Sequence, residues 1–272
     1  MQLVYFTKHW PGTPVEKLAH MARRIGADGL DLAVRDGHAV NPENVRKALP
    51  EAVHACQRLR VSIPMATMPT APTDPADAAT DSVFAACGEA GVRFVKLGYY
   101  QHQSGQDYWR EVERLRGLLE QIGRLAARHG VVACYHTHSG LFYGSNAAGL
   151  MHLLRGQDPE TLGAYLDVGH LTLNGEPIPL ALDIARDYLQ LVGMKAPVWE
   201  ARTEGGRTVW NWRIVPLTEG LVDCRLAIAE LRRAGFDGVL SFHGEYEMPP
   251  DRLPEPLRAE IALCRRLLKE TA

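Results

Sequence analysis

Polar side chains that can bind a metal or move a proton come directly after several short apolar runs. His136 and His138 end one run, Asp167 ends the next, and His243 and Glu245 end the last. Residues two apart on an extended strand share a face, so each pair points the same way. If these faces point toward one centre, imidazole and carboxylate groups meet there, and this mixture suits a divalent cation such as Zn²⁺ or Mn²⁺. Two histidines with one carboxylate also leave coordination positions open for substrate or water.

Basic residues accompany the other apolar runs. They are Lys8, Arg35, His38, Lys96 and Lys195. Arg35 and Lys96 are either solvated, paired with acidic residues or available to a ligand. His136 and His138 could instead have a structural role, as rings in the core or at the surface. Asp167 could instead cap a helix or turn that contains His170.

The elements that carry these residues alternate between strands and helices. Eight runs rich in β-branched and aromatic residues predict strands at Leu3–Thr7, Gly29–Val34, Arg60–Ala66, Arg93–Tyr99, Val131–His136, Ala164–Val168, Leu189–Met194 and Gly238–His243. Such alternation predicts a parallel sheet. We expect an α/β fold, a (β/α)8 TIM barrel in a single domain over residues 1–272. A doubly wound open sheet is the alternative, but neither GxGxxG after the first strand nor a Walker loop occurs.

Signals for helix ends agree with this pattern. The segment Tyr108–His129 carries apolar residues along one helical stripe. Thr13-Pro14-Val15-Glu16 has the pattern of a capping box that begins a helix. Gly91 and Gly130 stand between a helix and the next strand, where a left-handed residue is needed. In a barrel, the carboxyl ends of the strands build the site, so the polar residues named above belong to one end.

The connection from Ala196 to Leu221 is long for a barrel loop. It contains three tryptophans: Trp199, Trp210 and Trp212. Thr203–Arg213 predicts a hairpin around the Gly205-Gly206 turn. Loops of this length tend to be lids or binding loops, and a tryptophan-rich flap suits a carbohydrate, whose C–H faces stack on indoles. A partner interface or ordinary packing is the alternative.

The composition is that of an ordinary globular protein and excludes several classes. The 272 residues include 30 basic and 32 acidic ones, and the formal net charge of −2 gives no electrostatic reason to expect nucleic acid or an anionic membrane as partner. Five cysteines, an odd number without CxxC spacing, favour reduced thiols in the cytoplasm. We expect a cytoplasmic protein without a signal peptide, and no apolar run approaches the ~20 residues of a membrane span.

Several longer motifs resemble a known family. They are Gly26–Leu32, Leu166–His170, Val215–Asp223 and Gly235–Ser241. These segments are similar to the xylose isomerase-like TIM barrels, a group with sugar-phosphate isomerases and epimerases, keto-sugar 3-epimerases, inosose dehydratase and endonuclease IV. The resemblance covers nearly the whole chain. It implies a TIM barrel, a divalent metal (Mn²⁺, Zn²⁺ or Mg²⁺) and keto-sugar chemistry.

The resemblance also implies roles for single residues. In the epimerases, two glutamates, an aspartate and a histidine hold the metal, and the glutamates move the proton. The aspartate corresponds to Asp167, and a substrate-binding histidine corresponds to His170. The two glutamate positions hold His136 and His243 here, and Gly193 stands where the family has its metal histidine.

We therefore expect His136, Asp167 and His243 to bind the metal, with His138 or Glu245 as a fourth ligand. Glu245 or Lys195 would act as the acid/base. Lys8, Arg35 and His38 would grip hydroxyl groups or a phosphate. The full set of expected substrate contacts is Lys8, Arg35, His38, Lys96, His138, His170 and Trp199.

The expected function is a metal-dependent isomerase or epimerase that acts on a sugar or sugar derivative through proton abstraction next to a carbonyl. A lyase or dehydratase on a keto-sugar or keto-cyclitol begins with the same step, so the sequence does not separate the two. The missing histidine and glutamates also allow a non-catalytic sugar-binding barrel. A nuclease is disfavoured because no basic stripe accompanies the net charge of −2. A small-molecule sugar is thus the expected partner, and assembly into a homo-oligomer stays open.

Overall fold

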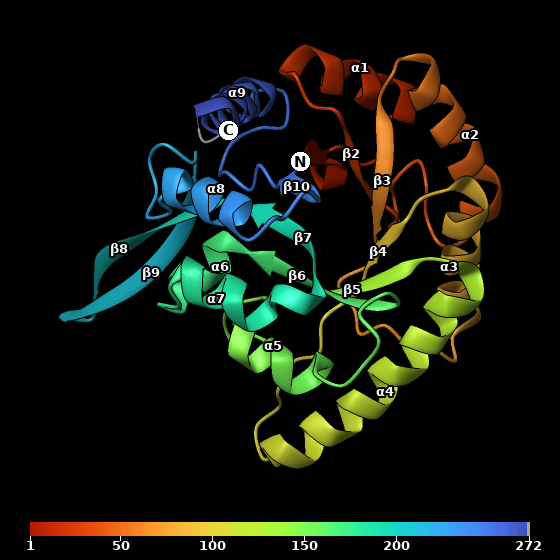
Figure 1. Ribbon diagram of the computed structural model, residues 1–272. Coiled ribbons are helices and arrows are strands. Elements are labelled where there is room, and N and C mark those ends of the chain that lie inside the picture. Colours follow the sequence, from red (N-terminus) through yellow and green to blue (C-terminus); the bar gives the residue numbers. More distant parts are fainter. Residues whose placement is uncertain (271–272) are drawn as a thin grey trace.

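Eight parallel strands close into a barrel, and helices form a ring outside it (Figure 1). This computed structural model describes residues 1–270. The barrel strands are β1 (Gln2–Phe6), β2 (Gly29–Ala33), β3 (Ser62–Thr67), β4 (Phe94–Lys96), β5 (Val132–His136), β6 (Leu162–Asp167), β7 (Leu189–Met194) and β10 (Val239–Phe242). Around the barrel their order is β1-β10-β7-β6-β5-β4-β3-β2, and each neighbouring pair is parallel. The TIM barrel expected from the sequence is confirmed.

The barrel strands are apolar because most of them are buried on both faces. Val4, Met65, Val132 and Tyr165 belong to a cluster that fills the barrel interior. A much larger apolar core lies between the strands and the surrounding helices. The polar residues at the carboxyl ends of the strands therefore stand on a packed floor, which fixes their backbone positions.

The helices follow the strands in the order that a barrel requires. They are α1 (Val15–Ile25), α2 (Val45–Arg58), α3 (Ala78–Ala90), α4 (Tyr108–His129), α5 (Ala147–Leu154), α6 (Val168–Leu173), α7 (Ile178–Ala185), α8 (Cys224–Arg233) and α9 (Pro254–Glu270), with short 3-10 turns η1 (Thr7–His9) and η2 (Arg186–Tyr188). Among the described residues, no helix combines the length and the apolar character that a membrane crossing needs.

The helix ends confirm part of the sequence prediction. Helix α4 has the predicted bounds, and Gly91 and Gly130 end α3 and α4 in the left-handed conformation, with φ of +73° and +66°. The capping box at Thr13 is wrong: α1 begins at Val15, and Pro14 occupies the N-cap position without a side-chain cap. Thr13 lies one residue too early, and the proline ring has no hydrogen-bonding group with which to replace it.

A long antiparallel hairpin, β8 (Ala196–Glu204) and β9 (Arg207–Val215), extends away from the barrel between β7 and α8 (Figure 1). Gly205 and Gly206 form the predicted turn, and both have the positive φ that a two-residue hairpin turn requires. The strands run further than the predicted Thr203–Arg213. One face of the hairpin presents the three exposed tryptophans, Trp199, Trp210 and Trp212.

Candidate functional site

Three buried side chains converge at the carboxyl end of the barrel. His136 is the last residue of β5, Asp167 is the last of β6, and His243 directly follows β10. Asp167 Oδ2 lies 3.4 Å from His136 Nε2 and 3.4 Å from His243 Nδ1. The strand-end residues that the sequence predicts as metal ligands are thus neighbours in space.

The facing atoms of these three residues lack hydrogen bonds. Within residues 1–270, His136 Nε2, Asp167 Oδ2 and His243 Nδ1 are buried without a hydrogen-bond partner, and they lie within 4.8 Å of one another. Buried polar atoms without partners are unfavourable, whereas one divalent cation would satisfy all three. The trio of His136, Asp167 and His243, called the metal trio below, could therefore bind a metal.

Two tyrosines form hydrogen bonds with the ring nitrogens of His136 and His243 that do not face Asp167. Tyr99 Oη lies 3.1 Å from His136 Nδ1, and Tyr165 Oη lies 2.9 Å from His243 Nε2. Such outer contacts orient metal-binding imidazoles and fix their tautomers. Neither tyrosine was predicted from the sequence to belong to the site. Tyr165 was detectable, because it stands two residues before Asp167 on the same strand and so points to the same side.

Electrostatics keeps both imidazoles of the metal trio in the metal-binding form. Burial is the largest cause of the strongly lowered pKa of His136 and of His243, and Lys195 lowers the pKa of each further. Burial alone would raise the pKa of Asp167, but Lys195 and His170 outweigh it and lower that pKa. Neutral imidazole beside ionised carboxylate is the protonation state that metal ligands need.

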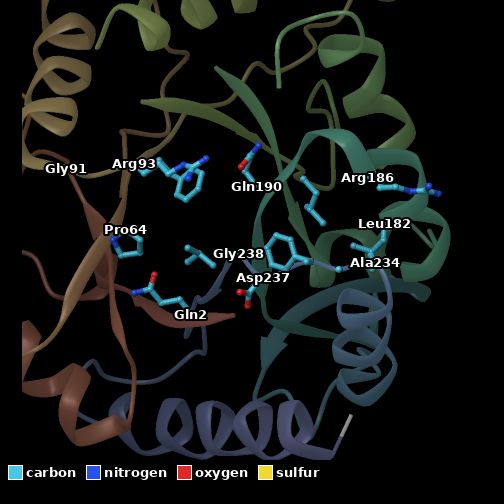
Figure 2. A pocket seen from close by; sticks show the side chains of 15 residues that line it. Gln2, Pro64, Gly91, Arg93, Leu182, Arg186, Gln190, Ala234, Asp237 and Gly238 are labelled. Carbon is cyan, nitrogen blue, oxygen red and sulfur yellow. The ribbon is translucent and has the colours of Figure 1, made fainter. Parts of the chain in front are cut away.

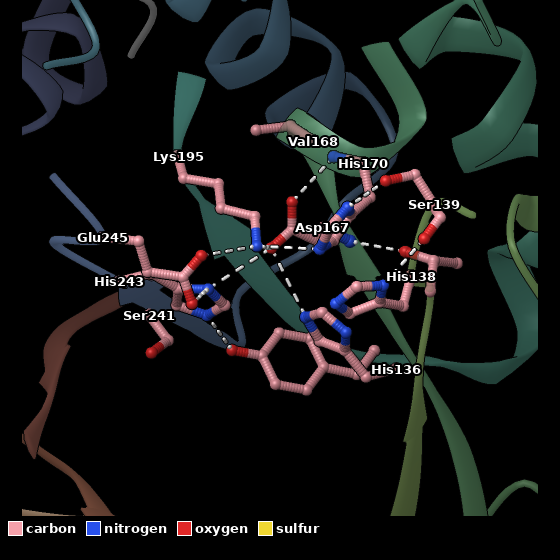
Figure 3. Close-up of polar contacts among 12 residues, drawn as sticks. His136, His138, Ser139, Asp167, Val168, His170, Lys195, Ser241, His243 and Glu245 are labelled. Carbon is pink, nitrogen blue, oxygen red and sulfur yellow. Dashed lines mark hydrogen bonds and ion pairs between the residues drawn. The ribbon is translucent and has the colours of Figure 1, made fainter. Parts of the chain in front are cut away.

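Lys195 and Glu245 form a charged network beside the metal trio (Figure 3). Lys195 Nζ lies 3.4 Å from Asp167 Oδ2 and 3.1 Å from Glu245 Oε2. The other carboxylate oxygen of Glu245 forms an ion pair with Lys8. His243 Nδ1 is 3.9 Å from Glu245 Oε1. The two residues expected to carry the acid/base chemistry are thus in contact.

The network assigns opposite charge states to its two central groups. Burial alone would lower the pKa of Lys195, but Asp167 and Glu245 outweigh it and raise that pKa. Burial alone would raise the pKa of Glu245, but Lys195 and Lys8 outweigh it and hold that pKa well below its ordinary value. Lys195 is therefore an ammonium ion and Glu245 a carboxylate, so Glu245 is the member of the pair that can accept a proton.

His170 supports the network rather than lining the cavity. Lys195 Nζ donates to His170 Nε2 at 2.8 Å, so His170 Nδ1 carries the proton and donates to Ser139 Oγ, also at 2.8 Å. His138 packs on this ring, with centroids 4.0 Å apart, and faces the cavity. Both ring nitrogens of His170 are therefore occupied by protein groups.

A small cavity of about 90 Å³ opens beside these residues. Its wall includes the expected residues Lys8, Arg35, Lys96, His136, His138, Lys195, His243 and Glu245. Asp31, Thr67, Tyr99 and Tyr165 also line it and were not identified from the sequence. Asp31 was detectable, because a lone carboxylate in the apolar run Gly29–Ala33 is unexpected unless it faces a polar centre.

Besides His170, two of the expected substrate contacts lie outside this cavity. His38 is partly buried in the loop after β2, where its backbone N–H donates to the carbonyl oxygen of Arg35. Trp199 is 45% exposed on the hairpin. Of the hairpin tryptophans, Trp212 comes near the site, with its ring centroid 6.4 Å from that of His170.

Gly193 provides the space that the metal trio occupies. It pairs with Asp167 across β6 and β7, and a Cβ atom there would lie 2.8 Å from Asp167 Oδ2 and 3.2 Å from His243 Cε1. The residue at this position therefore contributes room rather than a ligand.

A larger hollow of about 560 Å³ lies at the opposite end of the barrel (Figure 2). Gln2, Phe94, Gln190 and Val239, at or near the amino ends of their strands, contribute to its wall. Active sites of TIM barrels occupy the carboxyl ends of the strands. Size therefore does not identify the functional site here; the converging polar groups do.

Comparisons with known proteins agree with this fold. A family model described as xylose isomerase-like TIM barrel matches residues 19–267. Among solved structures, 3-keto-D-glucoside 4-epimerase from E. coli is 14% identical, with 98% of this chain and 99% of that chain covered and a TM-score of 0.74. D-psicose 3-epimerase from Clostridium cellulolyticum H10, solved with D-tagatose, is 12% identical over 98% and 99%, with a TM-score of 0.73. The probable 3-DHS dehydratase of petrobactin synthesis from Bacillus anthracis is 15% identical over 97% and 99%, with a TM-score of 0.72.

At these identities the structural likeness shows a shared fold and does not fix an activity. No curated protein sequence matches the chain.

Proposed function

We propose that this chain, which belongs to the xylose isomerase-like TIM barrel family, is a metal-dependent isomerase or epimerase of a sugar or sugar derivative. The observation that carries the proposal is the set of three buried, converging atoms without hydrogen bonds on His136, Asp167 and His243. The sugar epimerases among the structural neighbours support the substrate class. The charged pair beside the metal trio supports proton transfer rather than binding alone.

The site residues divide the chemistry among themselves. A divalent metal held by the trio would polarise a substrate carbonyl and stabilise the negative charge that develops on its oxygen. Glu245 would accept the proton from the carbon next to that carbonyl, because its carboxylate lines the cavity 3.9 Å from His243 Nδ1. Lys195 would balance the charge and return a proton, and His170 would hold it in place.

A lyase or dehydratase is the second candidate. It would use the same proton abstraction and then expel water from the neighbouring carbon. The dehydratase among the structural neighbours supports this second candidate. The product separates the two, since exchange of a substrate hydrogen for deuterium without loss of water indicates isomerisation or epimerisation, whereas an unsaturated product indicates elimination.

Metal content tests the ligand assignment directly. We expect the wild-type protein, reconstituted with Mn²⁺ or Zn²⁺ and desalted, to retain about one equivalent, and His136→Ala or His243→Ala to retain less than about a tenth of that. The matched control is His54→Ala, an exposed histidine on α2. Full metal occupancy in either ligand variant, measured by elemental analysis, would remove the basis of the proposal.

The role of Glu245 is tested separately from metal binding. Glu245→Gln should keep the metal but lose proton exchange, since an amide cannot accept the proton, with a fall of at least about 100-fold. NMR of ketoses incubated in D₂O measures the exchange. Loss of both metal and exchange would instead assign Glu245 as the fourth ligand, and full exchange in the variant would exclude it as the base.

A further inference from the structure

Four cationic side chains line the small cavity, and carboxylates neutralise two of them. The four are Lys8, Arg35, Lys96 and Lys195. Lys8 pairs with Glu245, and Lys195 pairs with both Glu245 and Asp167. Lys96 ends β4, the strand next to β5, which carries His136, and Arg35 lies two residues beyond the end of β2.

Lys96, at the end of β4, is buried without a carboxylate partner. Its side chain is 3% exposed, and its Nζ lies 3.7 Å from the ring centroid of Tyr99. Among residues 1–270 its Nζ makes neither a hydrogen bond nor an ion pair, whereas its backbone carbonyl oxygen accepts a hydrogen bond from Met68. Burial is the main cause of its strongly lowered pKa, and the charge of Arg35 lowers that pKa further.

Arg35 is also without a carboxylate partner. Its Nε donates to the carbonyl oxygen of Met68 at 3.1 Å, and its guanidinium lies 5.1 Å from the ring centroid of Phe6. The remaining N–H groups of the guanidinium make no hydrogen bond to any described residue.

The carboxylate of Asp31 attracts both cations, but it forms a direct ion pair with neither of them among the described residues. Asp31 accepts hydrogen bonds from Thr67 Oγ1 at 2.6 Å and from Ser241 Oγ at 2.7 Å, so both of its oxygens are taken. Burial is the main cause of the raised pKa of Asp31, and its hydrogen bonds with Thr67 and Ser241 oppose that rise. Two cations in a low-dielectric pocket without a paired anion are unfavourable, and an anionic ligand would remove that penalty.

We propose that Arg35 and Lys96 form a subsite for an anionic group, a carboxylate or a phosphate, on the substrate. The inference deepens the proposed function, because it makes the substrate an acidic sugar rather than a neutral one. A guanidinium can bind either anion through two parallel hydrogen bonds, and the lysine adds a point charge. Because the cavity measures only about 90 Å³, the anionic group and the reacting carbons should belong to one compact ligand.

Binding of three probes tests this subsite without any turnover. The probes are sodium D-gluconate for the carboxylate, inorganic phosphate for the phosphate, and D-glucitol as the neutral polyol. We expect at least one anion, and not D-glucitol, to raise the melting temperature and to bind measurably by calorimetry. Binding by gluconate alone identifies a carboxylate, and binding by phosphate alone identifies a phosphate.

The variants Lys96→Met and Arg35→Met should each weaken binding of that anion by about tenfold or more. Lys17→Met, an exposed lysine on α1, is the control and should bind as the wild type does. Lys96→Met should also melt at a higher temperature than the wild type in anion-free buffer, because it removes an unpaired buried charge. This gain distinguishes a lost ligand contact from a damaged fold.

Equal affinity for D-glucitol and gluconate, or unchanged anion affinity in both variants, would overturn the inference. Its failure is distinguishable from failure of the proposed function. Proton exchange on neutral ketoses without anion binding would leave the function standing and reject the subsite. Anion binding by a protein that neither holds a metal nor exchanges protons would support the subsite and reject the proposed function.

Discussion

At the scale of single residues, a substitution at Gly193 tests whether the metal trio binds the metal. Alanine at this position would place a Cβ atom 2.8 Å from Asp167 Oδ2, so the carboxylate would have to move away from the two ring nitrogens. We expect Gly193→Ala to weaken Mn²⁺ or Zn²⁺ binding by about tenfold or more, as changes beside metal ligands commonly do. Calorimetric metal titration measures the effect.

The control for this substitution is Gly117→Ala, since nothing lies within 4 Å of the added atom in α4. That change should leave metal affinity alone and stabilise the helix by about 0.5–1 kcal/mol. If Gly193→Ala binds metal as tightly as the wild type, the ion does not sit between Asp167 and the histidines.

The sequence predicted the metal trio and many of the charged residues around it, but not Gly193 or the two tyrosines that contact the histidine rings. His136, Asp167 and His243 could be recognised because each ends a strand, and the barrel geometry brings strand ends together. Gly193 could not be assigned a role, because its importance depends on the pairing with Asp167 across two strands. The predicted strand Arg93–Tyr99 is too long: β4 ends at Lys96, and Tyr99 lies beyond it, in a loop.

At the scale of elements, Asp167 joins β6 to α6 and serves both. Oδ1 accepts a hydrogen bond from the backbone N–H of His170 at 2.9 Å and so caps the helix, while Oδ2 faces the two histidines. The sequence presented the cap and the metal ligand as alternatives, but this carboxylate caps the helix with one oxygen and leaves the other available to a metal. Short helices depend on such caps, because their first N–H groups have no partner within the helix.

Two variants separate these roles. Asp167→Asn keeps an oxygen for the cap, whereas Asp167→Ala removes it, and both remove the charge beside Lys195. We expect both to lose the metal and Asp167→Ala to be less stable than Asp167→Asn by about 1 kcal/mol. Denaturant unfolding of the metal-free proteins measures the difference; equal stabilities would mean that the cap contributes nothing.

Elements with a strong local pattern were predictable, and those set by distant packing were not. The strand Leu189–Met194 and the helix Tyr108–His129 have their predicted bounds, because composition and apolar spacing define them. The Gly205-Gly206 turn was predictable from the conformation it needs, but the direction of the hairpin was not. It leaves the barrel wall beside α6 instead of covering the cavity, which leaves its tryptophans exposed.

At the scale of the whole molecule, the last helix ties the end of the chain to the segments around the site. Glu260 on α9 is 2% exposed, and its Oε1 accepts a hydrogen bond from the backbone N–H of Leu217 at 2.7 Å. Tyr246, three residues after His243, packs against the same carboxyl group and influences its ionisation. Burial raises the pKa of Glu260 from 4.5 to about 7.

This raised pKa makes the stability of the barrel depend on pH in a defined direction. The contribution of Glu260 is fully present below its unfolded pKa and is lost as pH rises through the folded pKa of about 7. The free energy of unfolding falls by about 3 kcal/mol over this range, because a tenfold change in proton affinity between the two states corresponds to about 1.4 kcal/mol. Glu260→Gln keeps an acceptor for Leu217 and cannot ionise, so it should gain stability relative to the wild type as pH rises from 5 toward about 7 and hold that gain above it.

Urea unfolding of both proteins across this pH range measures the difference, and Glu255→Gln, an exposed position on the same helix, should show none. Parallel stability curves for Glu260→Gln and the wild type would mean that this carboxyl group ionises no differently in the folded and unfolded chain. The pH dependence would then have to come from the charged groups of the cavity, and the metal-binding variants would shift it instead.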